Sequence, residues 1–219
     1  FIYYNPRDIV SGDFYWFKQK GDYLVIASAD CTGHGIPGAL LSMLGSELLN
    51  QIVLDPTINS PAKAIEMLDK GIYEAINRSG ESHQKDGIDL SLCTFNSKKN
   101  TFKFSGARRP ILVYDGNEIQ IYNSIPFSVG EIHIMKEKPI EIEIPIKKGD
   151  RIYMFSDGYI DQFGGEKNKK FLLRRFKEKI IELKNIPMNQ QKEVFNQTFN
   201  LWKGDQEQVD DVLVIGIEI

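Results

Sequence analysis

The middle of the chain is a series of short strand-like segments joined by tight turns, and this feature limits the fold more than any other. In the segment 88–95, apolar Ile88, Leu90 and Leu92 alternate with other residues, as in a strand with two different faces. A polar turn at 96–100 leads to further strand-like segments at 101–105, 111–114 and 118–122. Strands joined by such short turns pair in the antiparallel direction.

Two pairs of predicted helices flank this β-rich region. The segments 38–54 and 60–79 have apolar residues three and four apart, and Ser60-Pro61 is a typical helix start. A second helix pair is predicted at 169–183 and 189–202, and further strands at 23–29, 140–146, 151–155 and 212–219. This order is not the regular β-α-β alternation of a parallel sheet. We expect one α+β domain over residues 1–219, with helices on the faces of antiparallel sheet.

The composition excludes several classes of function. The 27 Lys and Arg residues against 30 Asp and Glu give a formal net charge of −3, so nucleic-acid binding by bulk positive charge is not expected. The two cysteines and three scattered histidines show no zinc-ligand spacing. Two cysteines are too few for a disulfide scaffold and fit a reducing compartment. No segment has the pattern of a membrane span or a signal peptide. Any chemistry is therefore expected to depend on acidic residues.

Four aspartates stand beside predicted strands, where a rigid backbone can hold a side chain at a sheet edge. They are Asp13 in a Ser-Gly-Asp-Phe segment, Asp30 after strand 23–29, Asp157 after strand 151–155 and Asp210 before strand 212–219. Carboxylates without His or Cys partners suit hard cations such as Mg²⁺ and Mn²⁺. Each aspartate can also be an ordinary turn residue or a solvated strand entry, and spacing alone does not bring the four together.

Five motifs occur along the chain in a characteristic order. They are SGDFYWF at 11–17, ADCTGHGIPGALLSMLG at 29–45, DGIDLSLC at 86–93, FSDGYID at 155–161 and QVDDVLVIGI at 208–217. Together they closely resemble the metal-dependent protein phosphatase 2C superfamily, in its bacterial SpoIIE-like branch. The resemblance covers nearly the whole chain and implies a fold of two antiparallel β-sheets sandwiched between helices.

The resemblance also implies two divalent cations, Mn²⁺ or Mg²⁺, and a set of ligands. Asp30 matches the carboxylate that bridges both ions, and the backbone carbonyl of Cys31 would be a further ligand. Asp157 and Asp210 match ligands of the second ion. Asp13 matches the acid that serves the first ion, mostly through waters.

Three further positions have less definite roles. Asp211 stands where many members of the superfamily have Asn, so it is either a metal ligand or a group that orients its neighbour. His34 is either a proton donor to the leaving group or a structural residue at a helix start. Arg7 is either a phosphate-binding arginine or a surface residue, and the surface interpretation is slightly favoured.

The implied reaction is direct attack of a metal-bridging hydroxide on phosphoserine or phosphothreonine, without a phosphoenzyme. The chain would then be a serine/threonine protein phosphatase in bacterial partner-switching signalling, and its phosphoprotein substrate could be an anti-sigma-factor antagonist. The alternative is a catalytically degenerate module that binds or regulates a partner. A metal phosphodiesterase acting on nucleotides is a third alternative, but its expected His-rich motifs are missing from the sequence.

Two basic segments have open roles. Arg108 and Arg109 lie where many relatives have a Gly-His-Asn-Pro-like turn, and they either help to recognise a phosphopeptide or belong to a solvated turn. The segment 167–179 either steers an anionic substrate or forms the solvated face of a helix. The solvated interpretation is favoured for both segments.

The chain begins with Phe1 rather than Met, which suggests a piece of a longer signalling protein. We expect an upstream sensor segment in the same chain, and a domain that lacks the first strand of the family. Helices 38–54 and 60–79 are expected to form a regulatory switch or a homodimer surface. The expected location is the cytoplasm, with attachment of the full-length protein to a membrane through an upstream segment left open.

Overall fold

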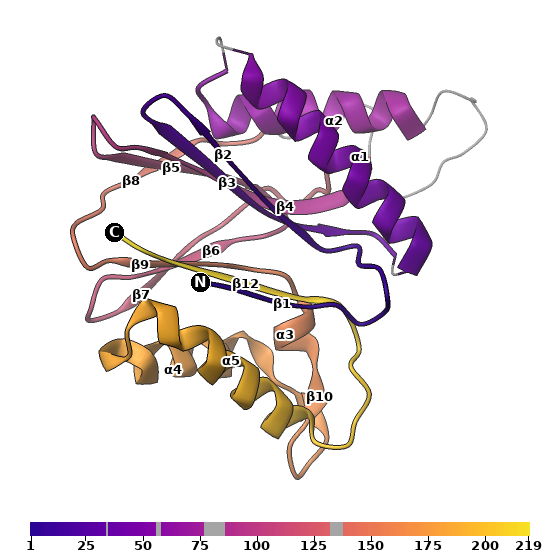
Figure 1. Ribbon diagram of the computed structural model, residues 1–219, viewed down its shortest axis with the longest axis vertical. Helices are drawn as coiled ribbons and strands as arrows, with labels where there is room; N and C mark the ends of the chain where they lie inside the picture. Colours follow the sequence, from indigo (N-terminus) through magenta and orange to yellow (C-terminus); the bar gives the residue numbers. More distant parts are fainter. Residues whose placement is uncertain (34, 56–57, 77–85, 132–137) are drawn as a thin grey trace.

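Two antiparallel five-stranded sheets lie face to face in the computed structural model, with helices on both outer sides (Figure 1). The structure describes residues 1–33, 35–55, 58–76, 86–131 and 138–219. Helices α1 (Gly35–Leu54) and α2 (Pro61–Ile76) cover one sheet, and α4 (Leu172–Glu182) and α5 (Met188–Lys203) cover the other. This α-β-β-α sandwich confirms the fold class predicted from the sequence.

The sheet next to α1 and α2 contains the strands β2 (Phe14–Lys20), β3 (Tyr23–Cys31), β4 (Ile88–Asn96), β5 (Thr101–Ala107) and β8 (Ile142–Ile144), in that spatial order. In β3 successive side chains point to opposite faces. Val25, Ala27 and Ala29 pack against the helix pair, whereas Ile26 faces the other sheet. The strand is therefore buried on both faces, as its apolar sequence indicates.

The second sheet contains β1 (Ile2–Asn5), β12 (Val212–Glu218), β9 (Arg151–Phe155), β6 (Ile111–Tyr114) and β7 (Ile119–Tyr122). Its outer face rests on an aromatic core that includes Tyr159, Phe176, Phe195 and Phe199. The short helix α3 (Gly158–Asp161) and the hairpin of β10 (Phe163–Gly164) and β11 (Lys169–Lys170) lead from β9 to α4, and the 3₁₀ turn η1 (Leu183–Asn185) joins α4 to α5.

Several element boundaries differ from the sequence expectation. β8 is shorter than the predicted strand 140–146, because only Ile142–Ile144 pairs with β5, and Pro145 has no N–H with which to continue the ladder. α4 begins later than residue 169, because Lys169 and Lys170 pair with β10 instead. Neither β1, which pairs along β12, nor β2, which pairs along β3, was among the predicted strands. None of the described helices is both long and apolar enough to cross a lipid bilayer.

Candidate active site

Both sheets contribute aspartates to one end of the sandwich. Asp30 lies near the end of β3, and Asp89 lies opposite it near the start of β4. From the second sheet, Asp157 follows β9, and Asp210 and Asp211 precede β12. Asp13, the remaining acid of the set, directly precedes β2.

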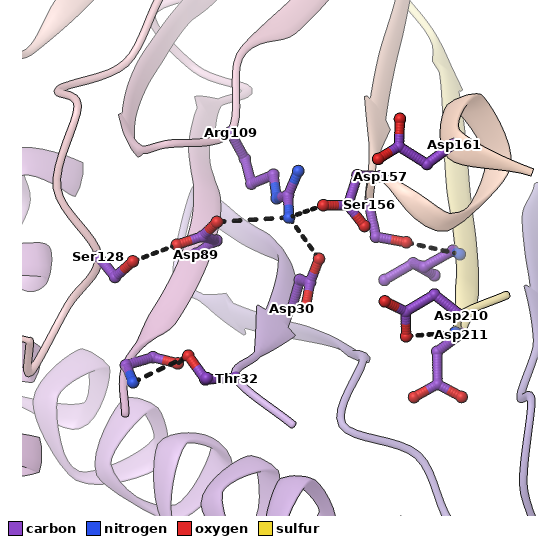
Figure 2. A network of polar contacts seen from close by, with 12 residues as sticks. Asp30, Thr32, Asp89, Arg109, Ser128, Ser156, Asp157, Asp161, Asp210 and Asp211 are labelled. Carbon is purple, nitrogen blue, oxygen red and sulfur yellow. Dashed lines mark hydrogen bonds and ion pairs between the residues drawn. The ribbon is translucent and has the colours of Figure 1, made fainter. Parts of the chain in front are cut away.

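The Arg109 guanidinium lies among three of these carboxylates (Figure 2). Its Nη2 atom is 2.5 Å from Asp30 Oδ2, 2.7 Å from Asp157 Oδ2 and 3.3 Å from Asp89 Oδ2. Arg109 belongs to the connection from β5 to β6, which crosses from one sheet to the other. Arg108 has a φ of +56°, and the Arg109 N–H donates to the Ala107 carbonyl at 2.7 Å. This tight turn presents Arg109 to the acids.

Burial and mutual repulsion raise the pKa values of four of the acids, Asp13, Asp30, Asp89 and Asp210. The pKa of Asp30 is raised to about 7, because burial and the nearby Asp157 carboxylate outweigh the lowering effect of the Arg109 guanidinium. Asp13 has a pKa well above its usual range, first because it is buried and second because Asp30 is close. Burial also raises the pKa values of Asp89 and Asp210. The cluster holds more negative charge than its own arginine neutralises.

Asp13 has a buried carboxylate oxygen without a hydrogen-bond partner among the described residues. Its residue is 4 % exposed, and the unpaired atom is Oδ2. Its loop is held close to the end of β3, since a Cβ added at Gly12 would lie 2.7 Å from the Gly33 carbonyl oxygen and 3.1 Å from that of Cys31. Only glycine fits this approach. A buried, unpaired carboxylate oxygen is expensive unless a cation binds to it.

Asp211 is directed toward backbone rather than toward the other acids. Its Oδ1 accepts a hydrogen bond from the Arg7 N–H and its Oδ2 accepts one from the Gly12 N–H, both at 2.8 Å. Its own N–H donates to Asp210 Oδ1 at 2.8 Å. Asp211 therefore connects the loop before β2 to the loop before β12, and both of its carboxylate oxygens are already engaged.

The Ser-Asp-Gly segment after β9 explains the position of Asp157. Ser156 continues the pairing with β12, because its N–H donates to the Leu213 carbonyl and its Oγ accepts from the Leu213 N–H, each at 3.0 Å. A Cβ at Gly158 would collide with the Asp211 carbonyl oxygen. The close approach that glycine permits sets Asp157 beside Asp210 and Asp211.

The remaining site residues predicted from the sequence differ in their surroundings. Arg7 is exposed, and its Nη1 donates to the Val209 carbonyl at 2.9 Å. Cys31 is buried, and burial raises the pKa of its thiol; its backbone carbonyl oxygen is the group that suits a hard cation. His34 lies outside the described residues.

A polar cleft opens beside the acids. Its lining consists of Asp30, Cys31, Thr32, Gly33, Asp89, Arg108, Ser128 and Asp210. Ser128 Oγ donates to Asp89 Oδ1 at 2.5 Å (Figure 2). The cleft gives a solute access to the acid cluster from one side.

The donor set fits divalent cations. Asp30 and Asp157 both bind a single cationic nitrogen, and Asp13 presents an unpaired oxygen close by. Within the described part of the chain, no group of three His, Cys, Asp or Glu side chains is arranged to hold an ion. Three of the carboxylates instead contact the Arg109 guanidinium. Oxygen donors of this kind suit Mg²⁺ or Mn²⁺.

Asp89 and Arg109 are the site residues that sequence reasoning missed. The solvated turn predicted for Arg109 was wrong, because the side chain is only 14 % exposed and carries the three ion pairs. Arg108 is 47 % exposed and lies 3.4 Å from Glu131, which agrees better with that prediction. The available signal for Asp89 was its place in the DGIDLSLC motif, but its role depends on strand register with Asp30.

The basic segment 167–179 makes mostly local contacts. Lys170 pairs with Asp161 at 2.8 Å, and Lys179 pairs with Glu182 at 2.5 Å. The Arg175 guanidinium lies over the Trp202 ring, 4.6 Å from its centroid. These contacts support the solvated helix face that the sequence analysis favoured.

The fold is that of the protein phosphatase 2C class. The SiaA-PP2C domain of Pseudomonas aeruginosa superposes with a TM-score of 0.90 at 29 % identity, covering 100 % of this chain and 85 % of that one. The catalytic domain of the serine/threonine protein phosphatase PstP, in complex with two manganese ions, has a TM-score of 0.68 at 14 % identity. That comparison covers 99 % of this chain and 96 % of PstP, and it concerns the fold alone.

The chain belongs to the SpoIIE family. The family model described as Stage II sporulation protein E (SpoIIE) matches residues 20–219. The phosphoserine phosphatase RsbU of Bacillus subtilis (strain 168) is 25 % identical over 182 residues, which are 81 % of this chain and 50 % of RsbU. This chain thus spans about half the length of that curated relative.

Proposed function

We propose that this chain is a metal-dependent serine/threonine protein phosphatase. The observation that carries the proposal is the convergence of Asp30 and Asp157, from two different sheets, on one cationic nitrogen. Membership of the SpoIIE family and the similarity to the phosphoserine phosphatase RsbU support the same reaction class. A catalytically degenerate binding module is not favoured, because Asp13, Asp30, Asp157 and Asp210 are all present.

The residues have separate roles in holding two divalent cations. Asp30 would bridge both ions, Asp13 and the Cys31 carbonyl would serve the first, and Asp157 and Asp210 the second. When bound, two such cations supply a hydroxide nucleophile at neutral pH and offset charge on the phosphoryl oxygens. The PstP domain, which shares the fold, holds two manganese ions in its structure.

Other residues support that arrangement. Asp211 holds the Gly12 and Arg7 backbone and thereby keeps Asp13 next to Asp210. We assign Asp211 to this positioning role, with both oxygens used. His34 remains our candidate for protonating the leaving oxygen, and Arg7 remains a candidate for contacting substrate phosphate.

The substrate and the partners form a second part of the proposal. A phosphoprotein such as an anti-sigma-factor antagonist is the proposed substrate in a cytoplasmic, partner-switching role, with an upstream sensor segment as the proposed regulator. The α1–α2 pair is the proposed switch or homodimer surface. Ile36, Leu40 and Met43 of α1 are 71 %, 63 % and 70 % exposed, and their spacing puts them on one side of the helix.

One assay tests the proposed reaction. Hydrolysis of p-nitrophenyl phosphate and of a phosphoserine protein is measured with Mn²⁺, with Mg²⁺ and with EDTA. Asp30→Asn and Asp157→Asn should each lower the metal-dependent rate by at least about 100-fold, because metal-ion catalysis contributes several kcal/mol. The matched control is Asp161→Asn, since Asp161 pairs with Lys170 at 2.8 Å. Metal-independent hydrolysis, or full activity of both site variants, would reject the proposal.

A further inference from the structure

Arg109 contacts two of the acids that would hold metal ions in the proposed function. One nitrogen of its guanidinium contacts Asp30, Asp157 and Asp89 at 2.5, 2.7 and 3.3 Å (Figure 2). Asp30 and Asp157 are also the acids to which we assign the bridging and second-ion positions. A guanidinium and a divalent cation on the same carboxylate oxygens would repel each other, so binding of one disfavours binding of the other.

The acids need a cation when metal is not bound. The side chains of Asp30 and Asp89 are each 17 % exposed, so water screens their repulsion only partly. Arginine stays protonated under all physiological conditions, and it therefore supplies a permanent positive charge. In this structure the three carboxylates are paired with a cation that belongs to the chain itself.

The contact geometry is poor for a permanent arginine salt bridge. A stable arginine–carboxylate pair usually uses two parallel N–H groups, whereas here a single Nη2 atom serves three carboxylates. The Nε atom of Arg109 is buried and has no hydrogen-bond partner among the described residues. An unpaired buried donor costs free energy. The arginine therefore satisfies the three carboxylates, and its own donors, only incompletely.

We propose that Arg109 is an internal counter-cation and that divalent ions displace it from Asp30 and Asp157. This inference rests on the metal site of the proposed function. Asp89 is outside the proposed ligand set and lies opposite Asp30 in the strand register, so it is the acid that keeps the displaced guanidinium beside the site. Arg109 is thus a positioning residue that lowers the metal affinity of the site and stabilises the metal-free protein.

Calorimetric titration with Mn²⁺ tests the competition directly. Arg109→Gln should bind Mn²⁺ about tenfold more tightly than the wild type, equivalent to about 1.4 kcal/mol, because no internal cation has to be displaced. Arg108→Gln removes the same charge from the neighbouring, 47 % exposed side chain, and it should change the dissociation constant by less than about twofold. The melting temperature without metal should fall in Arg109→Gln and stay near the wild-type value in Arg108→Gln.

A second measurement uses the wild-type protein and does not depend on a folded variant. The Nε–Hε resonance of Arg109, assigned by its loss in Arg109→Lys, is followed by NMR during titration with diamagnetic Mg²⁺. Displacement predicts that this resonance shifts in parallel with metal binding. A resonance that does not move at saturating Mg²⁺ would overturn the proposal.

The outcomes separate this inference from the proposed function. If Arg109→Gln bound Mn²⁺ with unchanged or weaker affinity, the counter-cation proposal would be overturned, whereas the proposed metal site would stand. If Arg108→Gln and Arg109→Gln both bound Mn²⁺ more tightly by the same factor, the cause would be the loss of one positive charge near the site. That result would also overturn the counter-cation proposal. If no protein in the series bound Mn²⁺, the metal site itself would be rejected, and displacement with it.

Discussion

Asp30 of β3 and Asp89 of β4 are direct partners in the antiparallel register of their two strands. Neighbouring side chains of this kind point to the same face of a sheet, so two carboxylates are held close together. Like charges opposite each other destabilise a sheet, and Arg109 reduces that cost here by contacting both.

Asp89→Asn tests whether Asp89 is a metal ligand or only a neighbour of one. If it acts through Arg109, the substitution should weaken Mn²⁺ binding by no more than about tenfold, whereas Asp30→Asn should weaken it by at least about 100-fold. Calorimetry measures both dissociation constants. Equal losses in the two variants would make Asp89 a ligand and contradict the proposed set.

Asp211→Asn should destabilise the protein by about 1–3 kcal/mol, because an amide can accept only one of the two N–H bonds from Arg7 and Gly12 without strain. The free energy of unfolding is measured with urea in EDTA. Asp205→Asn, at an exposed position, is the control and should change stability by less than about 0.5 kcal/mol. A stability loss no larger than that of the control would show that the connection is unimportant.

The metal-free protein should lose stability as the pH rises from about 4 to about 7. The pKa of Asp30 is raised to about 7, and those of Asp13, Asp89 and Asp210 are also raised. The folded protein therefore keeps protons in this window that the unfolded chain has released, so raising the pH favours unfolding. Melting temperatures in EDTA at several pH values measure the slope.

Asp30→Asn provides the control for that pH dependence, since the variant cannot titrate at this position and its slope should be shallower. A slope equal to that of the wild type would mean that another group causes the effect. Stability that rises through the window would contradict the raised pKa values.

Cys31→Ala should leave Mn²⁺ affinity within about twofold of the wild type. Mg²⁺ and Mn²⁺ are hard cations that prefer oxygen to sulfur ligands, so no metal–sulfur bond to the Cys31 thiol is expected. Only the backbone carbonyl is then available, and alanine retains it. Cys93→Ala, at the other buried cysteine, is the control for a general packing effect. A large loss of affinity confined to Cys31→Ala would indicate a sulfur ligand.

Much of the fold could be predicted because its information is local. Alternating apolar residues in 88–95 and helical spacing in 38–54 each depend on neighbours a few positions away. The boundaries of β8 and α4 were less accurate, because pairing partners far along the chain decide them. The strand β1 was missed for the same reason, since its partner is β12 at the other end of the chain.

The sequence by itself determined most of the order of the elements, the family motifs and the aspartates that stand beside strands. Only the tertiary structure decided that Asp89 faces Asp30 and that Arg109, 79 residues after Asp30, turns inward to contact both. The physical reason is that these relationships depend on strand register and on the packing of two sheets. An arginine in an exposed turn, with no partner in the site, would look the same in the sequence.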